Sequence, residues 1–200
     1  MRFALRALGA MSLSLLSTPA LANTAGITGM SNKSSGQSCN SCHLGASAPT
    51  VTLSGPTELA PGAKGEYTLT IRGGAAVVGG MNVAVDNTTA VLQPGTGSQK
   101  LGAEITHDGP QAFKDGELRF SFSLVAPTTP GTVKIYGAGN SANNNGSSDG
   151  DRGSSTTLDV TVTGDEGDDT QGGCSTTGGL PMFVLAMAAA GLPLLRRRWS

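Results

Sequence analysis

The clearest structural signal in the sequence is Leu118-Arg119-Phe120-Ser121-Phe122-Ser123-Leu124, in which apolar and polar residues alternate without interruption. A period of two places every second side chain on the same face of an extended chain. Phenylalanine is also among the residues that favour strands. The stretch therefore predicts a β-strand with its apolar side chains on the inner face and its polar side chains toward solvent.

Seven further stretches show the same alternation and are separated by turn residues such as Pro61-Gly62 and Pro130-Gly131. They are 51–53, 66–71, 81–85, 90–92, 103–105, 132–136 and 158–162. About eight short strands at this spacing predict an all-β domain over residues 50–163, an antiparallel β-sandwich of the immunoglobulin-like type. The inward-facing residues would interdigitate as its core. These are Tyr67, Leu69, Ile71, Leu118, Phe120, Phe122, Leu124, Val133, Ile135, Leu158, Val160 and Val162.

Composition fits one such domain. The chain has 200 residues with 30 glycines and only 4 % aromatic residues, so its core must consist mainly of Val, Leu, Ile and Ala. Eight basic and 14 acidic residues lie between Arg6 and Arg196, which gives the body a net charge of −6. An acidic body argues against nucleic-acid binding, because that affinity depends on Lys and Arg at the phosphates. Three cysteines are too few for a disulfide-dense scaffold.

The first 22 residues have the order of a secretory signal peptide. Arg2 and Arg6 precede an apolar run, and Ala20-Leu21-Ala22 supplies the small residues of a cleavage site. The run is too short and too interrupted to span a membrane. We expect cleavage after Ala22, so that the mature protein begins at Asn23 outside the cytoplasm.

Residues 23–49 lack apolar periodicity and predict an irregular segment. Within it, Cys39-Asn40-Ser41-Cys42-His43 has the two thiols and the adjacent imidazole that c-type haem attachment requires. Cys39 and Cys42 would form thioethers with the haem vinyl groups, and His43 would be the proximal iron ligand. The sequence thus predicts haem c on a loop beside a β domain.

The sequence leaves several candidates for the second iron ligand. His107 is the other histidine of the chain and is the candidate distal ligand, although a surface histidine in a turn explains it as well. A thioether from Met30 or Met81, the mature amino terminus or water are alternatives. Met81 alternates with Val83 and fits a core position better.

Three other interpretations of the cysteines and histidines compete with haem. Cys39 and Cys42 could form a local disulfide, but a redox role would need a thioredoxin-like setting that the sequence lacks. Cys39, Cys42, His43 and His107 could bind zinc, yet adjacent Cys42 and His43 cannot easily point at one tetrahedral ion. A hydrolase is not favoured, because no Gly-x-Ser-x-Gly nucleophile elbow occurs.

A polar, Gly- and Asn-rich loop is expected over residues 137–152. Its oxygen-bearing side chains make Ca²⁺ conceivable, with Asp149 and Asp151 as the charged ligands. A loop held by Asn and Asp side chains bonded to its own backbone is favoured over the ion site, because only two carboxylates are present.

The C-terminal part begins with an acidic, Gly-rich linker at 164–173. Cys174 follows, then small polar residues, an apolar run over 180–195 and Arg196-Arg197-Arg198. The run is slightly short for a spanning helix, which needs about 17–25 residues, and it contains two prolines. It predicts a short hydrophobic helix that anchors the chain, with the arginines on the cytoplasmic side.

The order Gly-Gly-Cys174, small polar residues, short apolar run and terminal arginines resembles the C-terminal sorting signal of myxobacterial exported proteins, the MYXO-CTERM type. The resemblance covers residues 174–200. It implies that Cys174 is the position at which the chain is processed and joined to a surface anchor. The alternative is a plain tail anchor with an incidental thiol.

Residues 36–163 resemble bacterial exported domains of the choice-of-anchor type, in which Cys-x-x-Cys-His precedes a Reeler-like or immunoglobulin-like β domain. The matching features are Cys39 to His43, Leu59-Ala60-Pro61-Gly62, Ile105-Thr106-His107 and the polar stretch from Ala142 to Asp151. This resemblance implies an architecture rather than an activity.

Together these features predict an exported protein anchored at the cell surface or outer membrane of a Gram-negative-type envelope. It would carry a single covalent haem c and transfer electrons to a redox partner protein in the envelope. The alternative is a surface adhesion or interaction module in which a Cys39–Cys42 disulfide holds the loop and no haem is present.

Overall fold

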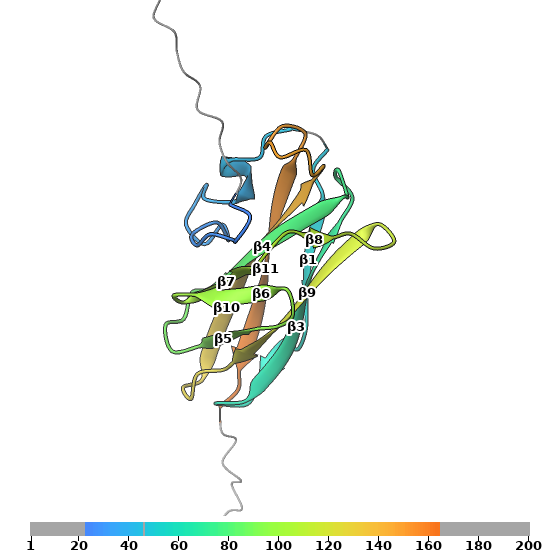
Figure 1. The fold of residues 1–200 in the computed structure, drawn as a ribbon. Helices are drawn as coiled ribbons and strands as arrows, with labels where there is room; N and C mark the ends of the chain where they lie inside the picture. The colour runs from blue at the N-terminus through green and yellow to red at the C-terminus, as the bar shows by residue number, and fades with distance from the viewer. Residues whose placement is uncertain (1–22, 46, 165–200) are drawn as a thin grey trace, which may run out of the picture. The chain divides into compact units, whose positions relative to one another are not determined.

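The computed structural model describes residues 23–45 and 47–164 of the chain. The predicted signal peptide, most of the linker and the C-terminal segment with Cys174 lie outside these residues. The described part consists of one short 3₁₀ helix and β-strands in two sheets (Figure 1). The elements are η1 (Cys39–Ser41), β1 (Thr50–Ser54), β2 (Glu58–Leu59), β3 (Lys64–Arg72), β4 (Val78–Val85), β5 (Val91–Pro94), β6 (Ser98–Leu101), β7 (Glu104–His107), β8 (Gln111–Ala112), β9 (Glu117–Val125), β10 (Gly131–Ala142) and β11 (Arg152–Val162).

The order of the strands defines an immunoglobulin-like β-sandwich. One sheet has the order β1-β3-β9-β5, and the other has the order β2-β11-β10-β4-β7-β6, with β8 also paired to β4. These orders correspond to strands A-B-E-D and G-F-C of the immunoglobulin fold. The β6–β7 hairpin extends the second sheet beyond β4. The all-β prediction and its two-sheet sandwich are therefore confirmed.

The core lies between the inner faces of the two sheets. Strands β3 and β9 pair antiparallel with Leu69 opposite Phe120 and Tyr67 opposite Phe122. The rings of Tyr67 and Phe122 stack with their centroids 5.7 Å apart. Every residue of the predicted inward set is buried except Leu158, which is partly exposed and packs against the core. The period of two therefore identified inward-facing residues of β3, β9, β10 and β11.

Strand β10 is longer than the sequence indicated. It continues through Gly137, Gly139 and Ser141 to Ala142, so the loop before β11 is shorter than the predicted 137–152. An added Cβ at Gly137 would lie 2.9 Å from Leu69, and one at Gly139 would lie 2.6 Å from Ile71. Glycine at these positions leaves room for the branched side chains of the facing sheet. The glycines that indicated a loop are core contacts of a strand.

Three short strands were not predicted, namely β2, β6 and β8. Their sequences, such as Ser98-Gln99-Lys100-Leu101 in β6, are too short or too polar to show an apolar alternation. They form because a neighbouring strand offers backbone partners, as β7 does for β6. Pairing with a neighbour, rather than their own sequences, makes them strands.

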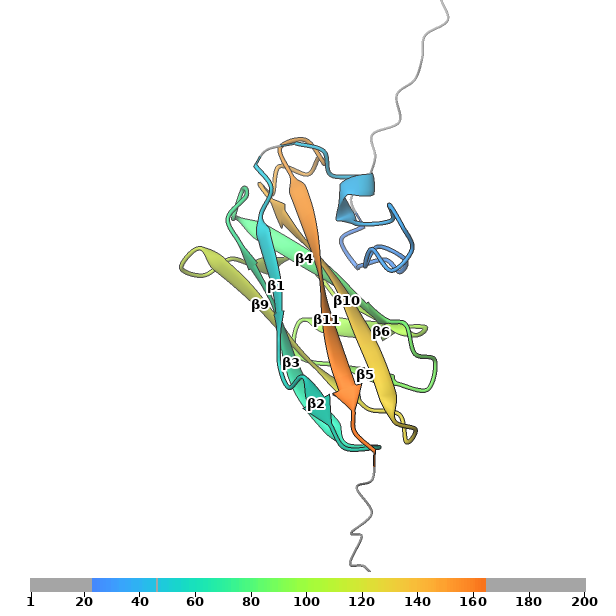
Figure 2. The same ribbon diagram turned by 180° about the vertical axis from the view of Figure 1, so that it is seen from behind.

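Residues 23–45 lie against the outer face of the second sheet (Figure 2). Several of their contacts to the strands are hydrogen bonds with strand side chains. Asn82 Nδ2 donates to Ile27 O at 2.7 Å, and Glu104 Oε2 accepts from Gly29 N at 2.7 Å. Within residues 23–45 and 47–164, no helix is long and apolar enough to cross a membrane.

Candidate functional site

The Cys-x-x-Cys-His motif forms a single compact turn. Cys39–Ser41 is a 3₁₀ helix whose N-cap residue, Ser38, exchanges side-chain hydrogen bonds with the turn: its Oγ accepts from Asn40 N, and its N–H donates to Ser41 Oγ. The N–H groups of Cys42 and His43 both donate to Cys39 O, at 3.3 and 3.1 Å. The two residues between the cysteines therefore close the turn that keeps both thiols and the imidazole close together.

This turn is docked on the start of β11. Asn40 Oδ1 accepts a hydrogen bond from Gly153 N at 2.9 Å. An added Cβ at Gly153 would lie 2.5 Å from Cys39 Cβ, so only glycine lets the cysteine approach the strand this closely. Gly45 N donates to Asp151 O at 2.8 Å on the other side of the motif. Long-range contacts thus fix the position of this single 3₁₀ turn on the second sheet.

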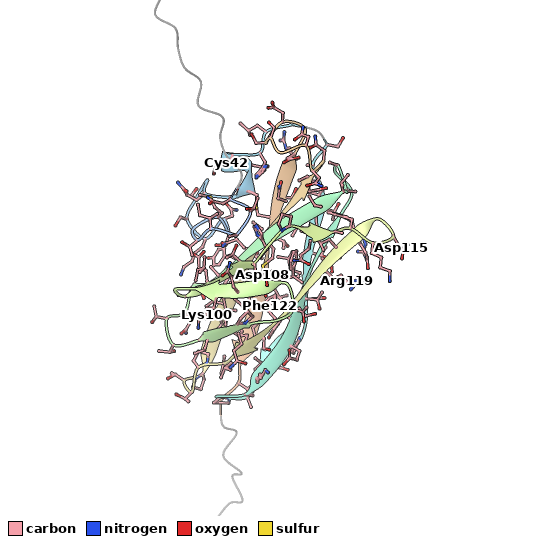
Figure 3. All side chains as sticks on the ribbon, in the orientation of Figure 1. Cys42, Lys100, Asp108, Asp115, Arg119 and Phe122 are labelled. Atoms are coloured by element: carbon pink, nitrogen blue, oxygen red, sulfur yellow. The ribbon has the colours of Figure 1, made fainter. Side chains whose placement is uncertain are left out.

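A cavity of about 280 Å³ lies between residues 23–43, the outer face of the second sheet and the loop before β11. Both cysteines of the motif, His43 and His107 line it. Figure 3 shows Cys42 on the N-terminal segment and Asp108, which directly follows the end of β7 at His107. Several of the other lining residues are apolar, including Ile27, Met30, Val78, Met81, Pro110 and Ala142. The structure therefore brings the two sequence-predicted histidines to one cavity.

His107 ends β7 and is half-buried. Its Nδ1 lies 3.2 Å from both the N and the O of Met81, and its Nε2 lies 3.3 Å from Asn23 O. The ring lies over Gly80, where an added Cβ would come within 2.6 Å of it. His107 is thus held in place by backbone groups on both sides. Met81 is a core residue, as its alternation with Val83 predicted.

His43 lies beside an acidic side chain that is distant in the sequence. Its Nδ1 is 3.2 Å from Asp151 Oδ2. The carboxylate is buried, with Asp151 only 3 % exposed. Among the hydrogen bonds of the described residues, none involves His43 Nε2. That nitrogen is consequently the one left for a ligand of the cavity.

Two buried polar atoms of the cavity wall have no hydrogen-bond partner among the described residues. They are Oδ1 of Asn82 and Oδ1 of Asn140. A buried acceptor without a partner costs roughly 1–3 kcal/mol. An occupant that donates a hydrogen bond, or water, would relieve this cost.

Burial raises the pKa of the Cys39 thiol to about 12, and the neighbouring Cys42 contributes further. Cys42 is exposed, and both cysteines are free thiols. In the folded protein without a bound group, the Cys39 sulfur is therefore held mainly as the neutral thiol near neutral pH.

No group of three or more His, Cys, Asp or Glu side chains that could hold a metal ion occurs in residues 23–45 and 47–164. The loop of Asp149 and Asp151 is held by internal bonds: Asn143 Nδ2 donates to Asp149 O, and Asn143 N donates to Asp151 Oδ1. Of the two calcium candidates, Asp151 is thus engaged by His43 and Asn143. Asp149 contributes its carbonyl to the loop.

Asn82, Asn140, Gly80 and Gly153 were not anticipated from the sequence. The period of two assigns Asn82 to the outer face of its strand, where polar residues are ordinary. Nothing local distinguishes it from a solvated asparagine. The signal that would have identified it is the N-terminal segment lying over that face, which only the folded chain contains.

Comparison with known proteins finds distant similarity at the level of the fold. No protein-family model matches the chain, and no curated protein does. The CARDB domain of a Pyrococcus furiosus protein, solved with di-metal ions, has 19 % identity and a TM-score of 0.32, covering 61 % of this chain and 92 % of its own. The PKD domain of an M14-like peptidase from a Thermoplasmatales archaeon has 22 % identity and a TM-score of 0.30, covering 58 % and 96 %.

The protein is thus an immunoglobulin-like β-sandwich, a class defined here by its own strand order. In this protein the Cys39–His43 turn is docked over a cavity on the outer face of one sheet.

Proposed function

We propose that the protein carries one c-type haem in the cavity on the outer face of the second sheet and transfers electrons in the cell envelope. Cys39 and Cys42 would hold the haem through thioethers. His43 would be the proximal ligand, and His107 the distal ligand. When bound, the group supplies one-electron redox chemistry.

The observation that supports this proposal is a single cavity lined by all four residues, although 64 positions separate His43 from His107. Two imidazole ligands would leave the iron no open position, which suits electron transfer rather than substrate binding. The apolar residues of the lining suit the faces of a large aromatic ring, as in other cofactor sites.

One further feature of the residues present fits the group: His43 Nε2 is free of hydrogen bonds within residues 23–45 and 47–164 and is available to bind iron. The volume of about 280 Å³ is slightly below the range for ligand sites, about 300–1,000 Å³. A porphyrin would therefore have to extend from the cavity into solvent.

His107 Nε2 would have to exchange its contact with Asn23 O for the iron. Asn23 is the predicted first residue of the mature chain, so few covalent constraints would oppose its movement. The N-terminal end of the segment is thus the part we expect to shift when haem is attached.

The surface location is part of the same proposal. Export depends on the predicted signal peptide. Attachment would use Cys174 in the MYXO-CTERM-like terminus, or the apolar run over 180–195 as a plain anchor. A redox partner protein of the envelope would then meet the haem outside the cytoplasm.

The direct test is intact-mass analysis and absorbance of the exported protein, produced together with a haem-attachment system. The wild type should gain the mass of one haem and show a Soret band. The double variant Cys39→Ala, Cys42→Ala should have the mass of the processed chain alone. Ser41→Ala, a change inside the same turn that removes no thiol or imidazole, is the matched control and should retain the haem.

His107→Ala tests the distal ligand separately. It should keep the attached haem but change the absorption spectrum from the six-coordinate, low-spin form. A colourless wild-type protein with the mass of the bare chain would overturn the haem proposal. The surface adhesion or interaction module would then remain, and thiol counting would show whether Cys39 and Cys42 are joined.

A further inference from the structure

Asp151 is a buried carboxylate whose principal side-chain partner is an imidazole. It is 3 % exposed, and burial of a charge is costly unless the charge is paired. Its Oδ2 lies 3.2 Å from His43 Nδ1, and its Oδ1 accepts from Asn143 N at 2.9 Å. Among the side-chain contacts of the described residues, His43 is the basic group that lies against the Asp151 carboxylate. The two side chains are 108 positions apart in the sequence.

The Asn-rich loop before β11 positions this carboxylate. Successive side chains of the loop bond to backbone groups two residues ahead: Asn145 N donates to Asn143 Oδ1, Ser147 N to Asn145 Oδ1, and Asp149 N to Ser147 Oγ. Asn143 Nδ2 closes the loop by donating to Asp149 O at 2.9 Å. The loop therefore ends with Asp151 held at a defined place beneath the Cys39–His43 turn.

The backbone on either side of Asp151 holds the motif as well. Asp151 O accepts from Gly45 N, and Leu44 forms an isolated bridge with Arg152. The position of the carboxylate relative to the imidazole is thus set by the main chain and does not depend on the side-chain contact alone.

An ionised carboxylate accepts hydrogen bonds and donates none. His43 Nδ1 must then carry the proton, so Nε2 carries the lone pair. In the neutral ring, Nε2 is therefore the nitrogen that can bind a metal ion, and it has no competing partner among the described groups. A histidine ligand oriented by a carboxylate is also a stronger electron donor.

We propose that Asp151 is a positioning residue for His43, which it holds in the Nδ1–H tautomer with Nε2 toward the cavity. A second consequence rests on the proposed function: with haem attached, the buried negative charge lowers the reduction potential of the iron. A negative charge close by stabilises the ferric state over the ferrous state, and more strongly where the dielectric constant is low. Lys and Arg are absent from the described residues that line the cavity, so the lining offers no positive charge to offset this effect.

The tautomer is tested without haem. Nitrogen-15 NMR of the imidazole rings in wild-type apo protein, at a pH of about 8.5 where ordinary imidazoles are neutral, should show His43 protonated at Nδ1. Asp151→Asn, whose amide can donate to Nδ1, should shift His43 toward the Nε2–H form. Asp149→Asn removes the same charge two positions away and should leave the His43 signals unchanged.

The wild-type spectrum needs no variant to fold, so the inference remains testable if Asp151→Asn is unstable. An Nε2–H tautomer in the wild type would overturn it. So would equal effects of Asp151→Asn and Asp149→Asn on the His43 signals.

The potential is tested on haem-loaded protein by spectroelectrochemical titration. Asp151→Asn should raise the midpoint potential, with about a tenfold or greater change in the ratio of oxidised to reduced protein at fixed potential, which is about 59 mV for one electron. Asp149→Asn, at an exposed position, should shift it far less. Equal midpoints in Asp151→Asn and the wild type would overturn this second part.

Failure of haem attachment would contradict the proposed function but would leave the tautomer measurement valid. A haem-loaded protein with the wrong His43 tautomer in its apo form would contradict the role of Asp151 alone. The two proposals can therefore fail separately.

Discussion

The β-sandwich and the N-terminal segment that lies against it are stabilised in different ways. The sandwich buries large apolar side chains from both sheets, such as Phe120, Leu69 and Ile135. In residues 23–45 only Ser31 is fully buried, and the segment is attached mainly through hydrogen bonds from its backbone to side chains of the strands. A buried large apolar side chain contributes about 1.5–3 kcal/mol, whereas a typical hydrogen bond contributes about 0.5–1.5 kcal/mol.

This difference matters for the site. The cavity is bounded on one side by rigid strands and on the other by a segment held by weaker contacts. Such a segment can adjust to an occupant at low cost, while the sheet keeps His107 and the loop with Asp151 in place. The site therefore combines a fixed wall with an adaptable one.

The largest expected effect comes from a substitution in the core, because unfolding of the sandwich would also release the N-terminal segment that is docked on it. Phe120→Ala removes a side chain that is 1 % exposed and should lower the free energy of unfolding by about 3–5 kcal/mol. Ser121→Ala, on the solvent side of the same strand, is the control and should change it by less than about 0.5 kcal/mol. Urea denaturation followed by far-UV circular dichroism measures both. Equal midpoints for the two variants would contradict the assigned core face of β9.

Gly153→Ala should separate the two regions. The added Cβ would lie 2.5 Å from Cys39 Cβ, and relieving such overpacking costs about 1–3 kcal/mol. Because the segment is less firmly held than the strand, we expect the turn to move and the sandwich to stay folded. A loss of 1.4 kcal/mol in docking makes the undocked state ten times more populated, so Cys39 alkylation should accelerate by about that factor.

The control for this substitution is Gly109→Ala, where nothing lies within 4 Å of the added Cβ. It should leave the alkylation rate of Cys39 unchanged. If Gly153→Ala instead unfolded the sandwich, with Cys39 protected until then, the docked turn would be as strongly held as the strands.

Alkaline pH should destabilise the docked Cys39–His43 turn first and the β-sandwich at a higher pH. Burial raises the pKa of both Cys39 and Tyr67 to about 12. Their ordinary values are about 8.5 and 10. A raised pKa in the folded state contributes stability that is complete below the ordinary value and is lost as the pH rises toward 12. The turn should therefore loosen above a pH of about 8.5, and the sandwich above about 10.

Cys39 protection, measured by alkylation and mass spectrometry in the haem-free protein, should decline at lower pH than the far-UV dichroism of the sandwich. Comparison with alkylation of the unfolded protein in urea at each pH corrects for the faster reaction of thiolates. Simultaneous loss of both signals would indicate one cooperative unit.

The smallest expected effect concerns one contact of the segment. Glu104→Ala removes the acceptor of Gly29 N, a hydrogen bond of 2.7 Å, and should weaken the attachment of the segment by about 0.5–1.5 kcal/mol. Native-state hydrogen exchange should show faster exchange near residue 29 with no change in the core strands. Glu58→Ala removes an exposed carboxylate from β2 and should leave exchange near residue 29 as in the wild type.

The predictable part of the fold was the part governed by neighbouring residues. Alternation in 66–71 and 118–124 located β3 and β9 and identified their inner faces. The continuation of β10 through Gly137 and Gly139 was not predictable, because glycine indicates a loop locally but here makes room for Leu69 and Ile71. The short strand β6 likewise depends on its partner β7.

The candidate site was likewise predictable only where its residues are close together in the sequence. Cys39, Cys42 and His43 are close in sequence, so their proximity followed from the motif. His107 was a candidate only because the chain has two histidines. The sequence suggested Asp151 only as a candidate calcium ligand. Its contact with His43 could not be predicted, because the two residues are 108 positions apart.

By itself, the amino-acid sequence determined that the eight alternating stretches become strands, which residues of the longest of them face inward, and that two thiols and an imidazole lie close together in the chain. These properties depend on side chains a few positions apart and on the period of an extended chain. Only the tertiary structure decided that Asp151 lies beside His43 and that His107, Asn82 and Asn140 border the same cavity. Those contacts depend on the register of strands across the sheet and on the segment that covers it, for which no local pattern exists.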